Sequence, residues 1–503
     1  MLTFLKNEKT EKTVKILKCI YLCIFTFFLV SREIVLLDFI IGNLFFTAGF
    51  MVVAVMFIGY DILTNRFCLK TRYFPAAVIF LGVTVISCII NYKYGIFSNL
   101  KGIAAFVIYF FLLYPESFSD KRAVVYSGCM NTAFFSIGLY SAFSIPMYFF
   151  DLYYFTISTQ QTHGFSPDSN RLWGLYQDPN YLALYSLLAI FAGVYLFIKT
   201  KLVLLKIVYV LVSIIHIVTL SMSGSRMGTV CFIAALFWIA AVICANVLKA
   251  KLFVRILAFL LGVILSLAIP FGSVELLNKA MPSIKKTVLN TISAEDYVNA
   301  RKAYNTVYKF CKIDAQYTDP DINIEKYPFN DEDNSVDRAD ENPNDMTNGR
   351  IYRWLDGLKL LAEKPFFGIS PRNIFSFADE IDTETLMGEY DFSIHNTYIE
   401  ILAGAGIIGG GFVIVFLFLA AFFIIKSAFK NPPSPKTIIC SAQIVMIALS
   451  AILLPDIIFF QLTFAGLCFW LALGHCLNSD PESYKNSLTY KWLTKLLKRE
   501  INI

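Results

Sequence analysis

Apolar runs long enough to cross a bilayer constrain this chain more than any other feature of its sequence. A spanning helix needs about 20 apolar residues, and spanning segments are helices because open sheet edges cannot persist in lipid. Hydrophobic residues make up 57% of the 503 positions and charged residues only 16%, which is less charge than a soluble protein carries. Twelve such runs lie near residues 14–31, 40–60, 74–91, 100–114, 123–149, 180–198, 203–220, 227–247, 252–271, 397–425, 437–454 and 457–476. We therefore predict an all-α, polytopic membrane protein with about 12 transmembrane helices.

Positive charges gather in the connections on one side of this arrangement. The clusters are Lys6, Lys9, Lys12, Lys15 and Lys18; Arg66, Lys70 and Arg72; Lys121 and Arg122; Lys199, Lys201 and Lys206; Lys249, Lys251 and Arg255; Lys426, Lys430 and Lys436; and Lys485, Lys491, Lys495, Lys498 and Arg499. Positive loops stay in the cytoplasm, so we predict a multi-pass protein of the cytoplasmic (plasma) membrane with both termini cytoplasmic. The first run lacks a small-residue cleavage site, which favours a retained helix over a signal peptide. The Lys and Arg residues behind the net charge of +6 sit in these clusters, where they set orientation, and no nucleic-acid partner is predicted.

The spans divide the chain into four predicted regions. Residues 1–271 form the first nine transmembrane helices, and residues 272–395 form one large extracytoplasmic loop between spans nine and ten. Residues 396–476 form the last three helices, and residues 477–503 form a basic cytoplasmic tail. A connection of more than 100 residues is too long to be a simple turn. The large loop is therefore a place to look for function.

Two parts of that loop differ in composition. Residues 314–349 are acidic and rich in Asn and Asp, which is typical of a loose surface stretch. Residues 350–363 carry apolar side chains at helical spacing, which predicts an amphipathic helix. Its apolar positions are Ile351, Leu355, Leu358 and Ala362, whereas Arg350, Arg353 and Gly357 lie on another face.

Four short stretches on the predicted outer side contain the candidate site residues. They are "RLWGLYQDPNYLAL" with Arg171, "SMSGSRMGTV" with Arg226, "NGRIYRWLDG" with Arg350 and Arg353, and "SIHNTYIEILAGAGIIGGG" with His395, Asn396 and Glu400. The first stretch has Asp178 before Pro179, a pattern that predicts a helix start. The glycines of the last stretch predict a loosened or kinked helix with close packing.

Each candidate has a structural explanation beside the functional one. Arg226 at the outer edge of a span is costly unless it meets a counter-charge or extends to lipid headgroups. Arg350 at a helix start suits a phosphate, or it pairs with the acidic stretch before it. His395 can act as a base or phosphate ligand, or it simply precedes a helix that Asn396 caps.

Metal and redox chemistry are not indicated. Eleven Cys are present and most lie in apolar runs, and no CxxC pattern stands in the large polar segment. The outer Asp residues are numerous, but they lie in the loose stretch, away from the candidate site residues. Arginines can neutralise a phosphate in place of a metal ion. We predict no metal and no cofactor.

The sequence resembles the family of O-antigen ligases and O-antigen or capsule polysaccharide polymerases, which are Wzy-like membrane glycosyltransferases. The resemblance rests on "GLYQDPNYLAL", "SGSRMG", "GRIYRWLDGLKLLAEKPFFGISPRNIF" and "HNTYIEILAGAGIIGG", in the family's order over about residues 170–412. It implies a metal-independent, inverting glycosyltransferase with a polyprenyl-diphosphate-linked glycan donor. The implied catalytic residues are Arg226, Arg350 and His395. Arg171, Arg353, Asn396 and Glu400 would bind substrate, and Arg353 can take the role of Arg350 because a long acidic insertion precedes both.

Several functions fit this resemblance. A polymerase of lipid-linked repeat units for capsule, exopolysaccharide or O-antigen is favoured, since frequent Ile, Phe, Lys and Asn indicate an AT-rich genome. A ligase would use a lipid A core or a protein as acceptor. A lipid-linked oligosaccharide flippase fits less well, because no internal repeat is visible. An enzyme of the peptidoglycan-polymerase type is a further alternative, but the outer carboxylate expected of such an enzyme is not evident in this sequence. Expected partners are the donor, a glycan acceptor, the bilayer, and a flippase and chain-length regulator.

Overall fold

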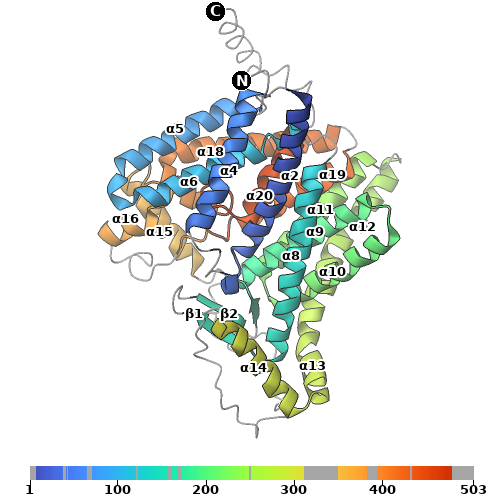
Figure 1. Cartoon of the computed structure of the whole chain (residues 1–503). Coiled ribbons are helices and arrows are strands. Elements are labelled where there is room, and N and C mark those ends of the chain that lie inside the picture. Colours follow the sequence, from blue (N-terminus) through green and yellow to red (C-terminus); the bar gives the residue numbers. More distant parts are fainter. Residues whose placement is uncertain are drawn as a thin grey trace, which may run out of the picture.

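A computed structural model of the chain describes residues 7–37, 41, 44–64, 71–119, 123–156, 161–166, 171–247, 251–310, 349–381, 393–430 and 433–478. Figure 1 shows a bundle of long helices with a smaller projection at one end. The loose stretch predicted for 314–349 lies outside the described residues apart from Gly349, and so does the tail from residue 479 on.

The bundle confirms an all-α, polytopic architecture. Within the described ranges, nine helices are long and apolar enough to cross a membrane, and three shorter apolar helices accompany them. Each of the twelve runs predicted from the sequence corresponds to one of these, while the count of spans itself stays a prediction. In chain order they are α2 (Glu8–Ser31), α4 (Leu44–Leu63), α5 (Phe74–Ile90), α6 (Ile96–Ile108), α8 (Val124–Phe149), α9 (Pro179–Lys199), α10 (Val203–Met222), α11 (Arg226–Val242), α12 (Leu252–Pro270), α18 (Thr397–Lys430), α19 (Pro435–Ser450) and α20 (Phe464–Asn478).

Polar side chains begin several of these helices. Asp178 accepts a hydrogen bond from the backbone N–H of Asn180 at 2.6 Å, and it caps α9 as its sequence predicts. Ser225 caps α11 in the same way, accepting from the N–H of Gly228 at 3.1 Å. Because the first N–H groups of a helix lack intrahelical partners, such caps fix where the helix starts. The starts of α9 and α11 both lie at stretches that the sequence singles out.

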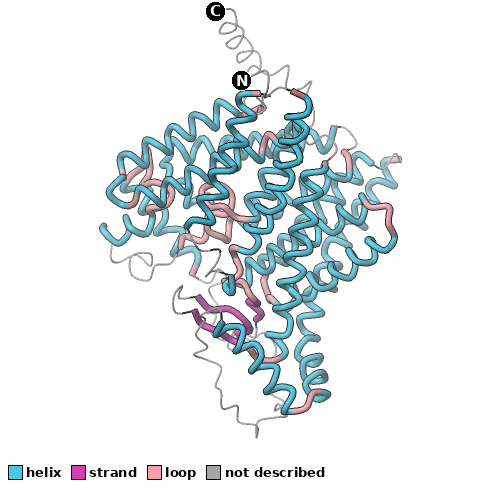
Figure 2. The backbone as a smooth tube through the Cα atoms, in the orientation of Figure 1, coloured by secondary structure: helices cyan, strands magenta, loops and turns pink. Residues whose placement is uncertain are grey.

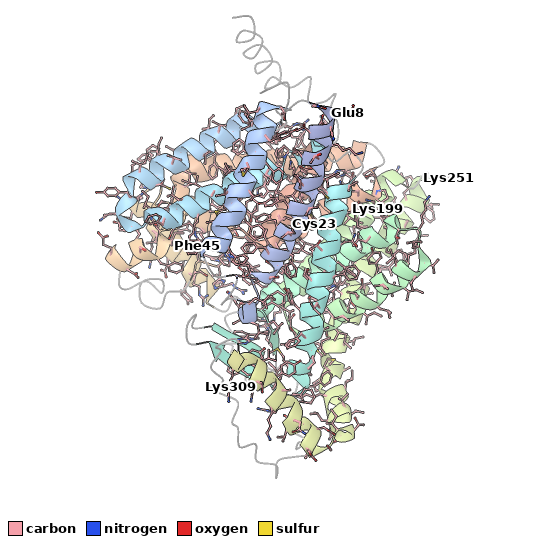
Figure 3. The ribbon with its side chains drawn as sticks, viewed as in Figure 1. Glu8, Cys23, Phe45, Lys199, Lys251 and Lys309 are labelled. Atoms are coloured by element: carbon pink, nitrogen blue, oxygen red, sulfur yellow. The ribbon has the colours of Figure 1, made fainter. Side chains whose placement is uncertain are left out.

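The two ends of the bundle differ in their side chains. Glu8, Lys199 and Lys251 lie toward the upper end of Figure 3, and Lys309 lies at the lower end. Lys199 and Lys251 belong to two of the basic connections that the sequence predicts on the same side of the membrane. The strands lie near the lower end, as Figure 2 shows. This arrangement agrees with alternate connections meeting at the same end of the bundle.

The lower projection contains structure that the sequence does not predict. Helix α12 continues through a π-helical turn, Phe271–Glu275, into α13 (Leu276–Thr291), and α14 (Ala294–Phe310) folds back beside it. The connection after α8 forms a three-stranded antiparallel sheet of β1 (Tyr153–Thr156), β2 (Gln161–Ser166) and β3 (Arg171–Gly174). The rings of Tyr154 and Tyr308 stack at 3.7 Å, so α14 covers this sheet. The all-α description therefore holds for the bundle but not for this small sheet.

The predicted run 457–476 is helical only from Phe464. The preceding residues 451–463 are non-helical, and the Asp456 carboxylate accepts backbone hydrogen bonds from Ile458, Phe459 and Phe460. The Tyr109 hydroxyl donates to the carbonyl of Gln461 at 2.6 Å. Irregular backbone is tolerated within a membrane protein where other protein groups satisfy it. Periodicity cannot detect such a segment, because its side chains are as apolar as those of a helix.

Helix α18 is broken at Gly406, where φ is 67° and ψ is −178°. The glycine-rich sequence predicts such a kink. The segment after α15 (Arg350–Glu363) fits into the break: the N–H of Ile407 donates to the carbonyl of Pro365 at 2.7 Å, and the N–H of Ile369 donates to that of Ala403 at 3.0 Å. A Cβ atom on Gly406 would lie 2.3 Å from the carbonyl oxygen of Phe366. Only glycine allows this contact between two distant segments.

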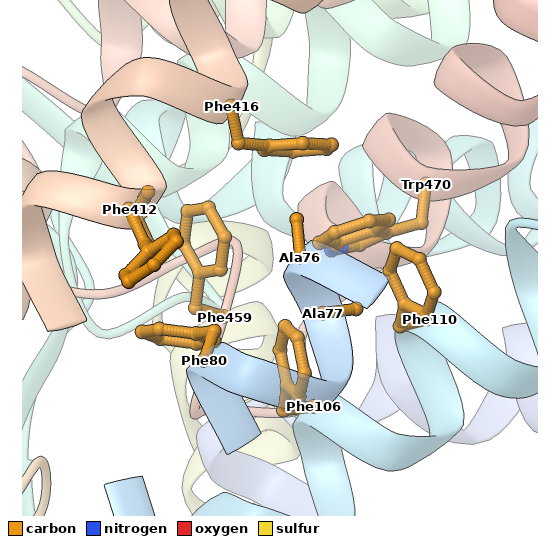
Figure 4. Close-up of a pocket in the computed structure, with 10 residues that line it drawn as sticks. Ala76, Ala77, Phe80, Phe106, Phe110, Phe412, Phe416, Phe459 and Trp470 are labelled. Carbon is orange, nitrogen blue, oxygen red and sulfur yellow. The ribbon is translucent and has the colours of Figure 1, made fainter. Parts of the chain in front are cut away.

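A pocket lined only by apolar side chains lies between α5, α6, α18 and α20. Its walls include Phe80, Phe106, Phe412, Phe459 and Trp470, as Figure 4 shows. Phe459 is also one of the residues whose backbone N–H donates to Asp456. The lining suits a hydrocarbon chain and would disfavour a charged ligand.

Candidate functional site

The start of α15 brings two arginines next to His395. The helix begins at Arg350, after Gly349 in the left-handed conformation with φ of 73°. It packs closely on side chains at the start of α18, because a Cβ atom on Gly357 would lie 2.9 Å from the Ile394 side chain and 2.8 Å from that of Ile399. Arg353 stands one turn before Gly357 on the same face. This face is therefore the one directed toward His395.

His395 is held in an unusual backbone conformation. Its φ is 50°, in the left-handed region that a non-glycine residue seldom adopts. Such strain persists only where the surroundings enforce it, and it gathers at functional sites. The Nδ1 atom of the ring is buried and has no hydrogen-bond partner among the described residues. A ligand that donates or accepts a proton at this nitrogen would satisfy it.

The charge state of the His395 ring follows from its neighbours. Burial, followed by the positive charges of Arg353 and Arg350, lowers the pKa of His395 to about 4. Burial and the charge of Arg350 also lower the pKa of Arg353. At neutral pH the imidazole is therefore unprotonated beside two cationic groups. This combination offers a base and an anion site at the same place.

Asn396 and Thr397 fix the start of α18. The Asn396 side-chain oxygen accepts from the backbone N–H groups of Tyr398 at 3.0 Å and Ile399 at 3.1 Å, so Asn396 is the predicted N-cap. The Thr397 N–H donates to the carbonyl of Ala451 at 2.8 Å. These bonds orient the segment that carries the imidazole. The prediction that Asn396 contacts substrate stays a prediction.

Glu400 lies one turn into α18 and contacts the loop before α20. Its carboxylate accepts from the backbone N–H of Asp456 at 2.8 Å. The hydroxyl of Tyr181, in the first turn of α9, lies within electrostatic range of both carboxylates and of Glu33. Sequence reasoning singled out Glu400 but missed the other two acids. For Asp456 the signal was a lone acidic residue within an otherwise apolar stretch, "LLPDIIFF".

A second group of site residues surrounds the start of α11. The Arg171 Nε atom donates to the carbonyl of Ser223 at 2.9 Å, and its side chain lies over Gly224, which has a φ of 56°. The Ser225 hydroxyl donates to the Asn180 side chain at 2.7 Å. Arg226, the next residue, begins α11 and is exposed. The structure thus brings together the first two of the four stretches.

Contacts along α19 connect the two groups. The Sγ atom of Cys231, five residues after Arg226, lies 3.3 Å from the hydroxyl of Ser450. The next residue of the chain, Ala451, accepts the hydrogen bond from Thr397, two residues after His395. The starts of α11 and α18 therefore lie at the same end of the bundle. Convergence of Arg226, Arg350 and His395 on one pocket remains a proposal.

The side chains present determine what the site could bind. In the described ranges, no group of three or more His, Cys, Asp or Glu residues is placed to hold a metal ion. Metal independence stays a prediction, which a chelator can test. The chemistry on hand is guanidinium, imidazole and carboxylate.

These features define a class: a multi-pass membrane protein with arginines and an unprotonated imidazole at one end of its helix bundle. Residues 211–414 match the model of a family described as O-antigen ligase. The match contains Arg226, Arg350, Arg353 and His395, and it confirms the resemblance that the motifs indicate. It supports processing of lipid-linked glycans of the O-antigen ligase or polymerase type. A search of curated proteins found no match.

Proposed function

We propose that this protein polymerises oligosaccharide repeat units carried on polyprenyl diphosphate into a surface polysaccharide, at the outer face of the cytoplasmic membrane. One observation carries the proposal: Arg350 and Arg353 stand beside an unprotonated His395 at a helix start. A diphosphate leaving group needs cations, and a sugar hydroxyl needs a base. The site offers both.

The arginines would stabilise the leaving group. As the bond between the anomeric carbon and the diphosphate oxygen breaks, the electron pair leaves with the diphosphate. Guanidinium groups grip phosphate oxygens with two parallel N–H donors and work best where water is excluded. Losing one such contact in the transition state costs about 3 kcal/mol, or roughly a hundredfold in rate. We assign this role to Arg350 and Arg226, with Arg353 and Arg171 in support.

His395 would act as general base. The acceptor hydroxyl oxygen attacks the anomeric carbon from the side opposite the diphosphate, and its proton passes to the imidazole. Nδ1 is buried and has no hydrogen-bond partner among the described residues, so the ring keeps a nitrogen that can accept this proton. Displacement from the opposite side inverts the anomeric configuration. The membrane holds the lipid tail of the donor, and positioning then supplies part of the rate.

A ligase is the second candidate, and a specific observation favours it: the matching family model is described as O-antigen ligase. The donor and the site chemistry would be the same. The acceptor would be a lipid A core or a protein in place of a second lipid-linked repeat. A flippase would need no base at all.

The lipid-linked glycans of a deletion strain separate these functions. A polymerase predicts that single repeat units accumulate on the carrier, because the next unit cannot be added. Full-length unligated chains would instead identify a ligase. Normal polymer in the deletion strain would contradict both.

The purified protein in nanodiscs, given lipid-linked repeats and EDTA, tests the metal prediction in the same system. Elongation should continue in the chelator. Activity that is lost and then restored by magnesium or manganese would contradict the role given to the arginines.

A further inference from the structure

Helix α15 has two faces with opposite surroundings. Ile351, Leu355 and Leu358 recur at helical spacing, and 47%, 50% and 43% of their surfaces are exposed. The other face carries Arg353 and Gly357 and packs on the segment before α18. An apolar stripe facing outward is the reverse of what a water-exposed helix shows. The stripe therefore needs an apolar environment outside the protein.

The segment after α15 reaches down the side of a transmembrane helix. The Pro365 carbonyl accepts from the N–H of Ile407, which lies ten residues after the start of α18 at Thr397. The first part of α18, from Thr397 to the break at Gly406, rises about 13 Å, which is less than half the thickness of the hydrocarbon layer. The side chain of Phe366 is 67% exposed at that point, and that of Ile407 is 57% exposed. The exposed apolar surface of this segment is continuous with the outward face of a spanning helix.

We propose that the apolar face of α15, together with Phe366, lies among the hydrocarbon chains of bilayer lipids in the outer leaflet. With 14 residues the helix is too short to span the membrane, and it is strongly amphipathic, as helices in the interface plane are. Continuity with the outward face of α18 identifies lipid as the occupant, in preference to a second protein. Lys359, also exposed, borders the apolar stripe; its ammonium pairs with the Asp356 carboxylate at 3.1 Å, and its stem can follow the hydrocarbon.

This placement has a consequence that rests on the proposed function. A helix lying in the interface holds Arg350 and Arg353 at the depth of lipid phosphates. A diphosphate on a lipid carrier arrives at that depth, so the arginines would meet it without drawing the lipid out of the membrane. The part of the large loop from Arg350 to Phe366 would then contact the membrane.

Lipid quenching tests the lipid contact without any assay of activity. The variants Leu355→Cys and Leu358→Cys carry a bimane fluorophore, with Glu363→Cys on the polar border of the same helix as a matched control. Each full-length protein is placed in nanodiscs of lipids with brominated or unmodified acyl chains, and the label on the parent protein is subtracted as background. Brominated lipids should remove most of the fluorescence at 355 and 358 and little at 363. Equal, weak quenching at all three positions would overturn the proposal.

Thiol accessibility in intact cells is a second measurement that does not depend on purification. A membrane-impermeant maleimide should label the cysteine at 363 quickly and the cysteines at 355 and 358 slowly. Fast labelling at all three positions would place the helix in water and overturn the proposal. Cysteines at 355 and 358 that react slowly in cells but quickly in nanodiscs, and that brominated lipids do not quench, would identify a protein partner. That result would also overturn the proposal. A protein that fails to polymerise glycans but shows the expected quenching would refute the proposed function alone.

Discussion

At the scale of single residues, the His395 side chain should show a displaced pH dependence. A general base must be neutral, and burial with two nearby arginines lowers the pKa of His395 to about 4. kcat/KM, which reports the free enzyme, should stay level from neutral pH downward and fall only near pH 4. Removing a neighbouring positive charge makes protonation easier, so Arg353→Gln should move this acid limb up by about one pH unit. The measurement is the pH profile of glycan transfer in nanodiscs.

The control for this profile is a conservative change away from the ring. Lys359→Gln removes a positive charge from the outer part of the same helix and should leave the limb in place. An acid limb near pH 6.5 in the unmodified protein would show that the imidazole is solvated, and it would contradict the buried base.

The second residue-scale prediction concerns Arg226. Arg226→Lys should cost nearly as much activity as Arg226→Ala, about a hundredfold, because an ammonium cannot reproduce the paired donors of a guanidinium. Arg338→Ala, in the acidic stretch outside the described residues, should be nearly silent. The measurement is polymer length and amount in a complemented deletion strain, with protein level checked. Near-normal activity of Arg226→Lys would mean that only charge matters there.

At the scale of elements, the break in α18 is the contact most sensitive to one added carbon. Gly406→Ala places a Cβ atom 2.3 Å from the Phe366 carbonyl oxygen, and it does so at a φ of 67°. The strain alone costs about 1–3 kcal/mol, and the clash would separate the α15 segment from α18. We expect a lower melting temperature and loss of glycan transfer together.

Gly411 in the same helix provides the matched control. A Cβ atom there meets no atom within 4 Å. Gly411→Ala should therefore be neutral or stabilising by up to about 1 kcal/mol, because alanine favours the helix. A Gly406→Ala protein as stable and active as the Gly411→Ala protein would contradict the interlocking of the two segments.

At the scale of the whole molecule, the arrangement predicts which end of the bundle faces out of the cell. The starts of α11, α15 and α18 share one end, and Lys199 and Lys251 lie toward the other. A single cysteine placed near Asp333, which lies outside the described residues, should react with an impermeant reagent in intact cells. Cysteines placed at either terminus should react only after permeabilisation. The reverse pattern would put the site in the cytoplasm and contradict the whole functional interpretation.

Several features of this protein could be predicted from the sequence by itself, because they depend on neighbours along the chain. Apolar runs of sufficient length must become membrane helices, since nothing else satisfies the backbone in lipid. The caps Asp178 and Asn396 act on N–H groups two or three residues away, so their patterns sufficed. The amphipathic spacing of 350–363 likewise gave the range of α15. The glycines of "AGAGIIGGG" also predicted that α18 is kinked.

Only the tertiary structure decided which of these pieces meet. Gly406 accommodates Phe366, Glu400 binds the backbone of Asp456, and Arg171 lies over Gly224, each across a gap of 40 residues or more. No local period encodes such a pairing, because the partners are chosen by packing of the whole bundle. The non-helical segment 451–463 escaped prediction for the same reason, because the distant Tyr109 hydroxyl binds its backbone. The low pKa of His395 is also tertiary, since it follows from burial and from two arginines that lie more than 40 residues earlier in the chain.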